Sequence, residues 1–429
     1  MLDIKLIREN PKLVRVNIKR RQDKEKLKLL TKVIKLDKKW RELTKELNAL
    51  RKSRNEISLE IAKLKKAGKK EQAIVKMKEA SKLPTKISQV ERKRDEVGEE
   101  LRIGLMSLPN LLHESVPFGK GEEDNVKIRI WGKPPEFDFK PKSHMEILLG
   151  LGLVDAERAA KISGAGFVYL KDEIALLDLA IQRFAIDFLR KRGFTIIEPP
   201  FMMRRKAYEG MTDLGDFENV MYKAEGEDLY FIATSEHPMG AMFMNEVFNK
   251  DQLPIKFAGV SPCFRREVGT HGKYTKGFFR MHQFNKVEQF IFCLPKHSWK
   301  FLEELQKNSE ALYQTLGLHH RVMNVCTGDI GNLAAKKYDV EVWMADGKFR
   351  EIGSNSNCTD YQSRRLNIRW REAEGKPVAG LVHTLNNTAL ATSRTMMAII
   401  EQFQQKDGTV VVPKVLQPFM NGIEVIGKK

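Results

Sequence analysis

The stretch FRREVGTHGKYTKGFFRMHQFNKVEQF, from Phe264 to Phe290, decides the fold of the larger part of this chain. It begins at the end of one apolar run, KFAGVSPCF, and contains most of a second, QFNKVEQFIF. Short runs rich in aromatic and β-branched residues predict strands. The runs YFIAT at 230–234 and VEVWM at 340–344 have the same character, so we expect an antiparallel β-sheet.

Helices are predicted on both sides of these strands. The run LLDLAIQRFAIDFLRKR predicts a long helix at about 173–192, ended by Gly193, because glycine favours helix C-termini. A last helix is expected after ATSR and through MMAIIEQFQ. Residues 146–429 therefore predict a domain of the α+β class, an antiparallel sheet flanked by helices.

Residues 27–101 show a different pattern, two helical seams separated by the break Ala67-Gly68-Lys69-Lys70. Steps of three, four and seven residues indicate a coiled coil. The two helices should fold back as an antiparallel hairpin, a coiled-coil arm, with a kink or a helix start at Pro84. Residues 1–26 should add a short strand or helix at its base. The seam positions are Trp40, Leu43, Leu47, Leu50, Ile57, Ile61 and Leu64 in the first helix, and Leu83, Ile87, Val90, Val97 and Leu101 in the second.

Three parts are therefore expected: an N-terminal domain at 1–107, a linker at 108–145, and the α+β domain at 146–429. The linker interpretation rests on a composition rich in Pro, Gly and charge, without helical periodicity.

The positive charge of the chain is concentrated in the arm. Residues 1–104 hold 32 Lys and Arg against 16 Asp and Glu, a net charge of +16, which leaves +3 for the other 325 residues. A twofold excess of one sign favours contact with a polyanion, and we expect nucleic acid. Alternative interpretations of the arm are a solvated helix surface or a simple dimerisation coil.

Several classes of protein are disfavoured by the sequence. No window of about twenty residues lacks charge, so no membrane span is expected. The start MLDIKLIREN has no apolar signal region. The cysteines Cys263, Cys293, Cys326 and Cys358 are widely spaced, which favours reduced thiols in a cytoplasmic protein.

Three segments of the α+β domain resemble the signature motifs of class II aminoacyl-tRNA synthetases. These are GFTIIEPPFMM (193–203), the opening stretch 264–290, and NNTALATSRTMMAIIE (386–401). Within that class, TSEHP (234–238), TGDIGNLAAKKYDVEVW (327–343) and EIGSNSNCTDYQSRR (351–365) resemble the seryl-tRNA synthetase family. One departure is ALATSR, where many class II enzymes carry glycines before the arginine.

The resemblance implies a serine–tRNA ligase, an enzyme that activates L-serine with ATP and transfers it to tRNA(Ser), and to tRNA(Sec) as a second acceptor. It implies a homodimer built on the first motif. The arm's basic residues at 27–101, with His271 and Lys273, would contact tRNA.

The resemblance also assigns candidate site residues. The catalytic set is Arg265, Glu267 and Arg394. Serine would be bound by Thr234, Ser235, Glu236, Arg265, Glu288, Asn386 and Thr388. ATP would be bound by Arg265, Glu267, Arg280, Phe284, Glu351, Ser354 and Arg394, with Mg²⁺ on Glu351 and Ser354; no zinc is expected.

These residue types suit the joining of two anions. Arginine forks neutralise carboxylate and phosphate, an aromatic ring can stack on adenine, and carboxylate and hydroxyl oxygens are ligands for Mg²⁺. Two other hypotheses remain. One is a paralogue that loads a carrier protein, which would lack the arm. The other is a catalytically silent homologue, in which the ATP residues would be degraded.

Overall fold

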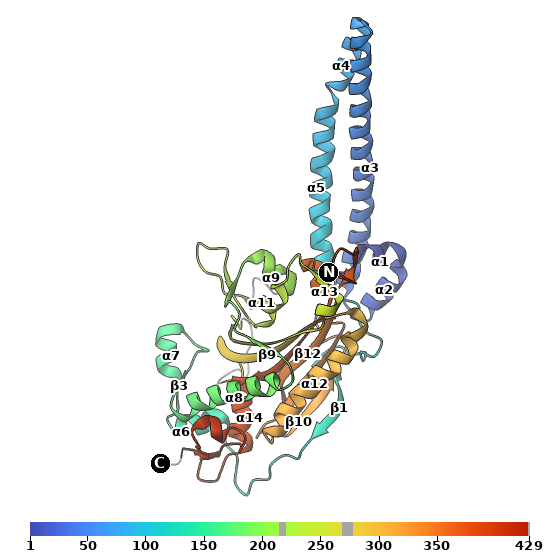
Figure 1. Cartoon of the computed structure of the whole chain (residues 1–429). Coiled ribbons are helices and arrows are strands. Elements are labelled where there is room, and N and C mark those ends of the chain that lie inside the picture. The colour runs from blue at the N-terminus through green and yellow to red at the C-terminus, as the bar shows by residue number, and fades with distance from the viewer. Residues whose placement is uncertain (214–219, 268–277, 428–429) are drawn as a thin grey trace. The chain divides into compact units, whose positions relative to one another are not determined.

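The structure is a computed structural model that describes residues 1–213, 220–267 and 278–427. The chain divides into two compact units (Figure 1). One unit contains Leu2–Lys19 and Asp23–Pro109. The other contains Asn110–Lys429 together with Met1 and Arg20–Gln22.

The first unit is helical, and three of its helices form the predicted arm: one runs outward, and two, separated at Ser81–Lys82, run back (Figure 1). Asp23 caps the long first helix of the arm by accepting hydrogen bonds from the backbone amides of Glu25 and Lys26. Gly68 makes the turn at the tip with a φ of +75°, a conformation that glycine adopts at little cost. Its helices are α1 (Ile4–Glu9), α2 (Pro11–Lys19), α3 (Lys24–Lys66), α4 (Lys70–Ala80) and α5 (Leu83–Ser107).

The two predicted seams are the inner faces of this hairpin. Leu47 of α3 packs with Ile87 and Val90 of α5 in a small apolar cluster. An ion pair from Arg51 to Glu91, 2.6 Å long, also joins the two helices. Pro84 lies in the first turn of α5, so it starts that helix rather than kinking it. Residues 1–26 hold two short helices and the first residues of α3.

The second unit is built on an eight-stranded sheet with the order β1-β10-β11-β12-β15-β9-β8-β4. All neighbours are antiparallel except β4 and β8, which are parallel. The strands are β1 (Val126–Trp131), β4 (Thr195–Ile197), β8 (Ile255–Phe264), β9 (Gln283–Cys293), β10 (His320–Asn324), β11 (Lys336–Trp343), β12 (Phe349–Thr359) and β15 (His383–Ala391).

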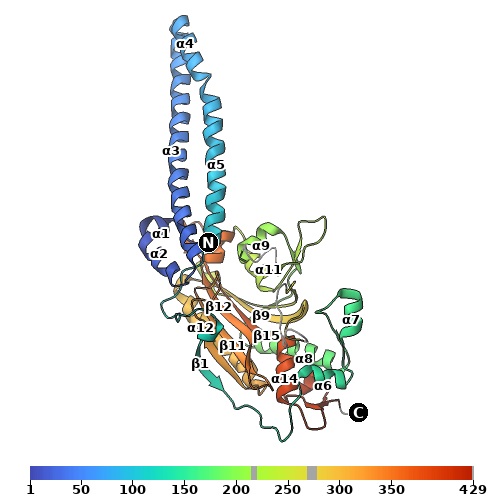
Figure 2. The ribbon, with the colours of Figure 1, turned by 180° about the vertical axis from the view of Figure 1, so that it is seen from behind.

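One face of this sheet carries the main hydrophobic core. The helices α8 (Glu173–Arg190), α12 (Ser298–Thr315) and α14 (Thr392–Gln402), labelled in Figures 1 and 2, contribute to that core. Val287 of β9 and Leu385 of β15 belong to the same core. Side chains alternate between the two faces of a strand. The residues next to these core positions, such as Glu288 and Asn386, therefore point to the opposite face, where the site lies.

Smaller elements complete the second unit. The helices are α6 (His144–Gly150), α7 (Ala156–Ser163), α9 (Arg205–Met211), α11 (Glu236–Ala241) and α13 (Tyr361–Leu366). The short strands are β2 (Val154–Asp155), β3 (Tyr169–Leu170), β5 (Met202–Met203), β6 (Tyr230–Phe231), β7 (Val247–Asn249), β13 (Arg369–Arg371), β14 (Val378–Leu381), β16 (Val410–Val411) and β17 (Val425–Ile426). Single 3₁₀ turns lie at Glu122–Asp124, Lys250–Gln252, Pro295–His297 and Gln417–Met420.

Two details differ from the sequence-based expectation. The segment 108–145 is not a structureless linker, because Val126–Trp131 forms edge strand β1 and pairs with β10. Every residue of β1 is exposed, so the strand lacks the buried apolar alternation by which strands are recognised. The last helix begins at Thr392 and not after Arg394, so Arg394 belongs to its first turn.

None of the helices in the described part of the chain is both long enough and apolar enough to cross a membrane. The four cysteines are buried and form no disulfide.

Candidate active site

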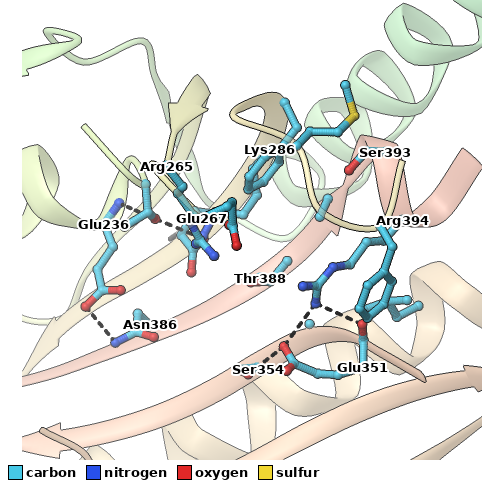
Figure 3. Close-up of a pocket in the computed structure, with 18 residues that line it drawn as sticks. Glu236, Arg265, Glu267, Lys286, Glu351, Ser354, Asn386, Thr388, Ser393 and Arg394 are labelled. Atoms are coloured by element: carbon cyan, nitrogen blue, oxygen red, sulfur yellow. Dashed lines mark hydrogen bonds and ion pairs between the residues drawn. The ribbon is translucent and has the colours of Figure 1, made fainter. Parts of the chain in front are cut away.

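A cavity opens on the sheet face opposite the main core, and most of the predicted site residues line it (Figure 3). They come from three neighbouring strands, β12, β15 and β9, and from segments that adjoin them. The predicted residues in its wall are Thr234, Glu236, Arg265, Glu267, Phe284, Glu288, Glu351, Ser354, Asn386, Thr388 and Arg394.

Strands β9 and β15 present their residues by simple alternation. Phe284 and Glu288 of β9 are an even number of residues apart and share the cavity face, as do Asn386 and Thr388 of β15. Glu288 lies directly opposite Thr388 in the register between the two strands. This pairing fixes the floor of the cavity.

Strand β12 contains a bulge that lets both of its predicted site residues face the cavity. Glu351 and Ser354 are three residues apart, so in a regular strand they would point to opposite faces. The register with β11 shifts between Gly353 and Glu351, which inserts one extra residue. Glu351 Oε1 consequently lies 3.3 Å from the Ser354 hydroxyl, on the cavity side.

Glu236 lies at one end of the cavity, at the start of helix α11. Its Oε1 accepts hydrogen bonds from the side-chain amides of Gln362 and Asn386, each 3.0 Å long. Burial, reinforced by the negative charge of Glu288, raises the pKa of Glu236 to about 7. A cationic ligand at this end would relieve that cost by favouring the carboxylate.

Glu288 has a cationic neighbour that the sequence-based assignment missed. Lys286 of β9 forms an ion pair with Glu288, and both side chains are almost completely buried. Thr234 donates a hydrogen bond of 3.4 Å to Glu288 from the other side. The alternation from Phe284 through Lys286 to Glu288 is the signal that could have identified this lysine.

Arg265 lies between this end of the cavity and its middle. Its Nε donates to the backbone carbonyl of Ala233 at 3.3 Å, and its guanidinium lies 5.3 Å from the centre of the Phe284 ring. Both contacts leave terminal nitrogens of the fork available to an anion. Glu267 follows on the cavity wall and pairs with Arg280 at 3.2 Å.

Arg394 lies at the other end, in the first turn of α14. It donates to the backbone carbonyl of Glu351 at 2.9 Å and reaches the Glu351 carboxylate at 3.4 Å. Its guanidinium also lies over the Phe279 ring, 4.6 Å from the centre. Burial tends to raise the pKa of Glu351, but the positive charges of Arg394 and Lys337 outweigh it and lower the pKa below its usual value.

Two predicted residues do not line this cavity. Ser235 is fully buried and donates to the carbonyl of Gly259 at 3.3 Å, so its role is to hold the loop before α11. Arg280 lines neighbouring hollows instead and contacts the cavity through Glu267. His271 and Lys273 lie outside the described residues.

Two oxygen ligands in the cavity suit a divalent cation. Among the described residues, no cluster of three or more His, Cys, Asp or Glu side chains could hold a metal ion by itself. Glu351 and Ser354 offer two oxygens on one face. This suits Mg²⁺, which usually takes one or two protein oxygens and completes its shell with phosphates and water.

Comparisons with known proteins agree along the whole chain. Residues 1–112 match the model of the seryl-tRNA synthetase N-terminal domain, and residues 217–403 match that of the class II tRNA synthetase core domain for G, H, P, S and T. The serine–tRNA ligase of Methanocella arvoryzae is 52% identical over 99% of this chain and 100% of its own length.

Solved structures give the same result. Seryl-tRNA synthetase from Pyrococcus horikoshii, complexed with ATP, superposes with a TM-score of 0.93 at 48% identity over 99% of both chains. A cytoplasmic serine–tRNA ligase from Naegleria fowleri in complex with AMP gives 0.87 at 36% identity, over 99% of this chain and 98% of that one.

Proposed function

The chain belongs to the seryl-tRNA synthetase family, and we propose that the cavity of Figure 3 is where it activates serine. The protein is a serine–tRNA ligase, an ATP-dependent aminoacyl-tRNA synthetase. The observation that supports the assignment of the cavity is the set of charged side chains that line it. Glu236, Glu288 and Lys286 lie at one end, Arg265 and Glu267 follow, and Arg394 with Glu351 lies at the far end.

Serine would occupy the end formed by Glu236 and Glu288. The Glu236 carboxylate, with Thr234, would bind the ammonium group. Glu288 and Thr388 would bind the hydroxyl group, and Asn386 would line the same pocket; all five residues are in the cavity wall. A pocket that hydrogen-bonds a hydroxyl group rejects alanine because its own polar groups would be left unpaired.

ATP would occupy the middle and the far end. Phe284 would stack on the adenine ring, and Glu267 would accept from the adenine amino group. Arg265 would bridge the serine carboxylate and the α-phosphate while the carboxylate oxygen attacks phosphorus and pyrophosphate leaves. Arg394 would hold the γ-phosphate.

Glu351 and Ser354 would hold Mg²⁺, which, when bound, neutralises phosphate charge. No general base is needed for this step, since a carboxylate is already a nucleophile. Alignment of the two anions and neutralisation of their charge account for most of the rate. In the second step a hydroxyl group of the tRNA 3′ adenosine attacks the carbonyl of seryl-adenylate, and AMP leaves.

The arm is proposed to bind tRNA. The net charge of +16 in residues 1–104 and the length of the hairpin favour contact with RNA phosphates over base edges. We also propose tRNA(Sec) as a second acceptor and the cytoplasm as the location.

A homodimer is proposed on the segment 193–203. Strand β4 in this segment is the last strand of the sheet, and its outer edge is not paired within the described part of the chain. An open edge is a surface on which a second copy can add. Light scattering after gel filtration should give a mass of twice 49.4 kDa, and a mass of 49.4 kDa would contradict the dimer.

The proposed site is tested by serine-dependent ATP–pyrophosphate exchange, with alanine, threonine and glycine as controls. We expect exchange with serine alone. Exchange with alanine at a comparable rate would contradict the assignment of Glu288 and Thr388 to the hydroxyl group.

A further inference from the structure

One buried carboxylate close to the site is not used by the mechanism above. Asp339 of β11 lies directly opposite Ser354 of β12 in the register of the sheet. Its side chain is only 7% exposed, and it is not part of the cavity wall. Asp339 therefore lies beside Ser354 on the same face of the sheet, outside the cavity wall.

The Ser354 hydroxyl has two carboxylates within reach but only one proton to donate. Its oxygen lies 2.6 Å from Asp339 Oδ1 and 3.3 Å from Glu351 Oε1. The shorter distance assigns the proton to Asp339, because a charge-assisted O–H···O bond has its optimum at about 2.5–2.7 Å. The lone pairs of the serine oxygen are then left on the cavity side.

Lys337 supports Asp339 from the same strand. Its Nζ lies 3.3 Å from Asp339 Oδ2, the oxygen that does not bind Ser354. Each oxygen of Asp339 thus has a partner of its own.

We propose that Asp339 is a positioning residue for the cation site: it holds the Ser354 proton and so turns the serine oxygen toward Mg²⁺. The inference rests on the proposed function, because it presupposes a cation on Glu351 and Ser354. Because the Ser354 proton is donated to Asp339, the Glu351 carboxylate does not have to accept it and can bind the cation and Arg394. Losing a hydrogen bond that orients a metal ligand commonly changes metal affinity by about 10- to 100-fold.

The test is the binding of Mn²⁺ to the full chain in the presence of a non-hydrolysable ATP analogue. The electron paramagnetic resonance signal of free Mn²⁺ measures how much of the ion is unbound. Asp339→Ala should raise the Mn²⁺ Kd about tenfold. Asp339→Asn keeps the shape and one acceptor oxygen, so its Kd should lie between those of Asp339→Ala and the unchanged protein. If Asp339→Ala does not fold, Asp339→Asn alone still tests the proposal.

A double-mutant cycle separates positioning from a general structural effect. Ser354→Ala alone should weaken Mn²⁺ binding, and adding Asp339→Ala or Asp339→Asn to it should weaken binding no further. Ser356→Ala, in the same strand, is the matched control and should leave the Kd unchanged. Independent effects of the two residues, or an unchanged Kd in Asp339→Asn, would overturn the proposal. If the proposed function itself were wrong, the unchanged protein would show no serine-dependent pyrophosphate exchange, which is a different result from any of these changes in Mn²⁺ affinity.

Discussion

Arg265 is the residue on which serine activation should depend most. Arg265→Ala removes the cation placed between the serine carboxylate and the α-phosphate, so serine-dependent pyrophosphate exchange should fall by about a hundredfold or more. Its neighbour Arg266 is exposed and does not line the cavity, which makes Arg266→Ala the matched control. Equal rates in the two variants, with circular dichroism unchanged, would refute the role of Arg265.

Glu236 should make serine binding depend on pH. Its pKa of about 7 lies above the usual value of 4.5, so between these values the folded protein holds a proton that the unfolded chain has released. Serine binding needs the carboxylate and must expel that proton. Affinity for serine should therefore rise with pH, by roughly tenfold from about pH 6 to pH 8.

Calorimetry in two buffers of different ionisation enthalpy would detect the proton released on serine binding. Glu236→Gln is the control, and it should bind serine weakly with no pH dependence over this range. A flat profile in the unchanged protein would show that Glu236 does not titrate where serine binds.

At the scale of single residues, motif resemblance predicted a set that the structure largely brings together in one cavity. Ser235, predicted to bind serine, is not among the residues that line the cavity, because its hydroxyl hydrogen-bonds the buried carbonyl of Gly259. Lys286 was missed although it stands between Phe284 and Glu288 on the same strand face. Asp339 could not be found in this way, because its importance depends on a cross-strand partner.

At the scale of elements, the strands and helices were more predictable than their irregularities. The heptad seams predicted the arm helices, and the apolar runs predicted strands β8, β9 and β11. The bulge in β12 was not predictable, since nothing in the spacing of Glu351 and Ser354 marks an extra residue. Strand β1 was missed because it is an exposed edge strand without alternating burial.

The arm can be shortened without disturbing its base. Trp40 and Gly98 face each other across the hairpin, since a Cβ added to Gly98 would lie 3.1 Å from the Trp40 indole nitrogen. Replacing residues 41–97 with a short Gly-Ser turn should therefore keep the lower parts of α3 and α5 paired, including the buried Leu30 and Val33.

This shortened protein should keep its rate of pyrophosphate exchange, because no residue of the cavity wall lies in the removed segment. Charging of tRNA at low tRNA concentration should fall by about tenfold or more, because many basic residues are lost. Rates of exchange and charging that fell together would indicate a general loss of folding. Unchanged charging would show that the arm does not bind tRNA.

At the scale of the whole molecule, the positive charge is concentrated in the first quarter of the chain. Residues 1–104 carry +16 and the remaining residues +3, although the second group is three times longer. Binding of phosphates by such a surface releases counterions and weakens as salt rises, whereas ATP and serine meet only a few charges in a partly buried cavity. The two half-reactions should therefore respond differently to salt.

If the arm contacts about six phosphates, affinity for tRNA should fall about a thousandfold between about 50 and 200 mM salt. The KM for tRNA should rise correspondingly, while serine-dependent exchange over the same range should change little. The protein with the shortened arm is the control, and the slope of its log KM against log salt should be much smaller. A shallow slope in the full chain would mean that the excess charge of the arm is not used to bind RNA phosphates, and that shape or apolar contacts would have to select the tRNA instead.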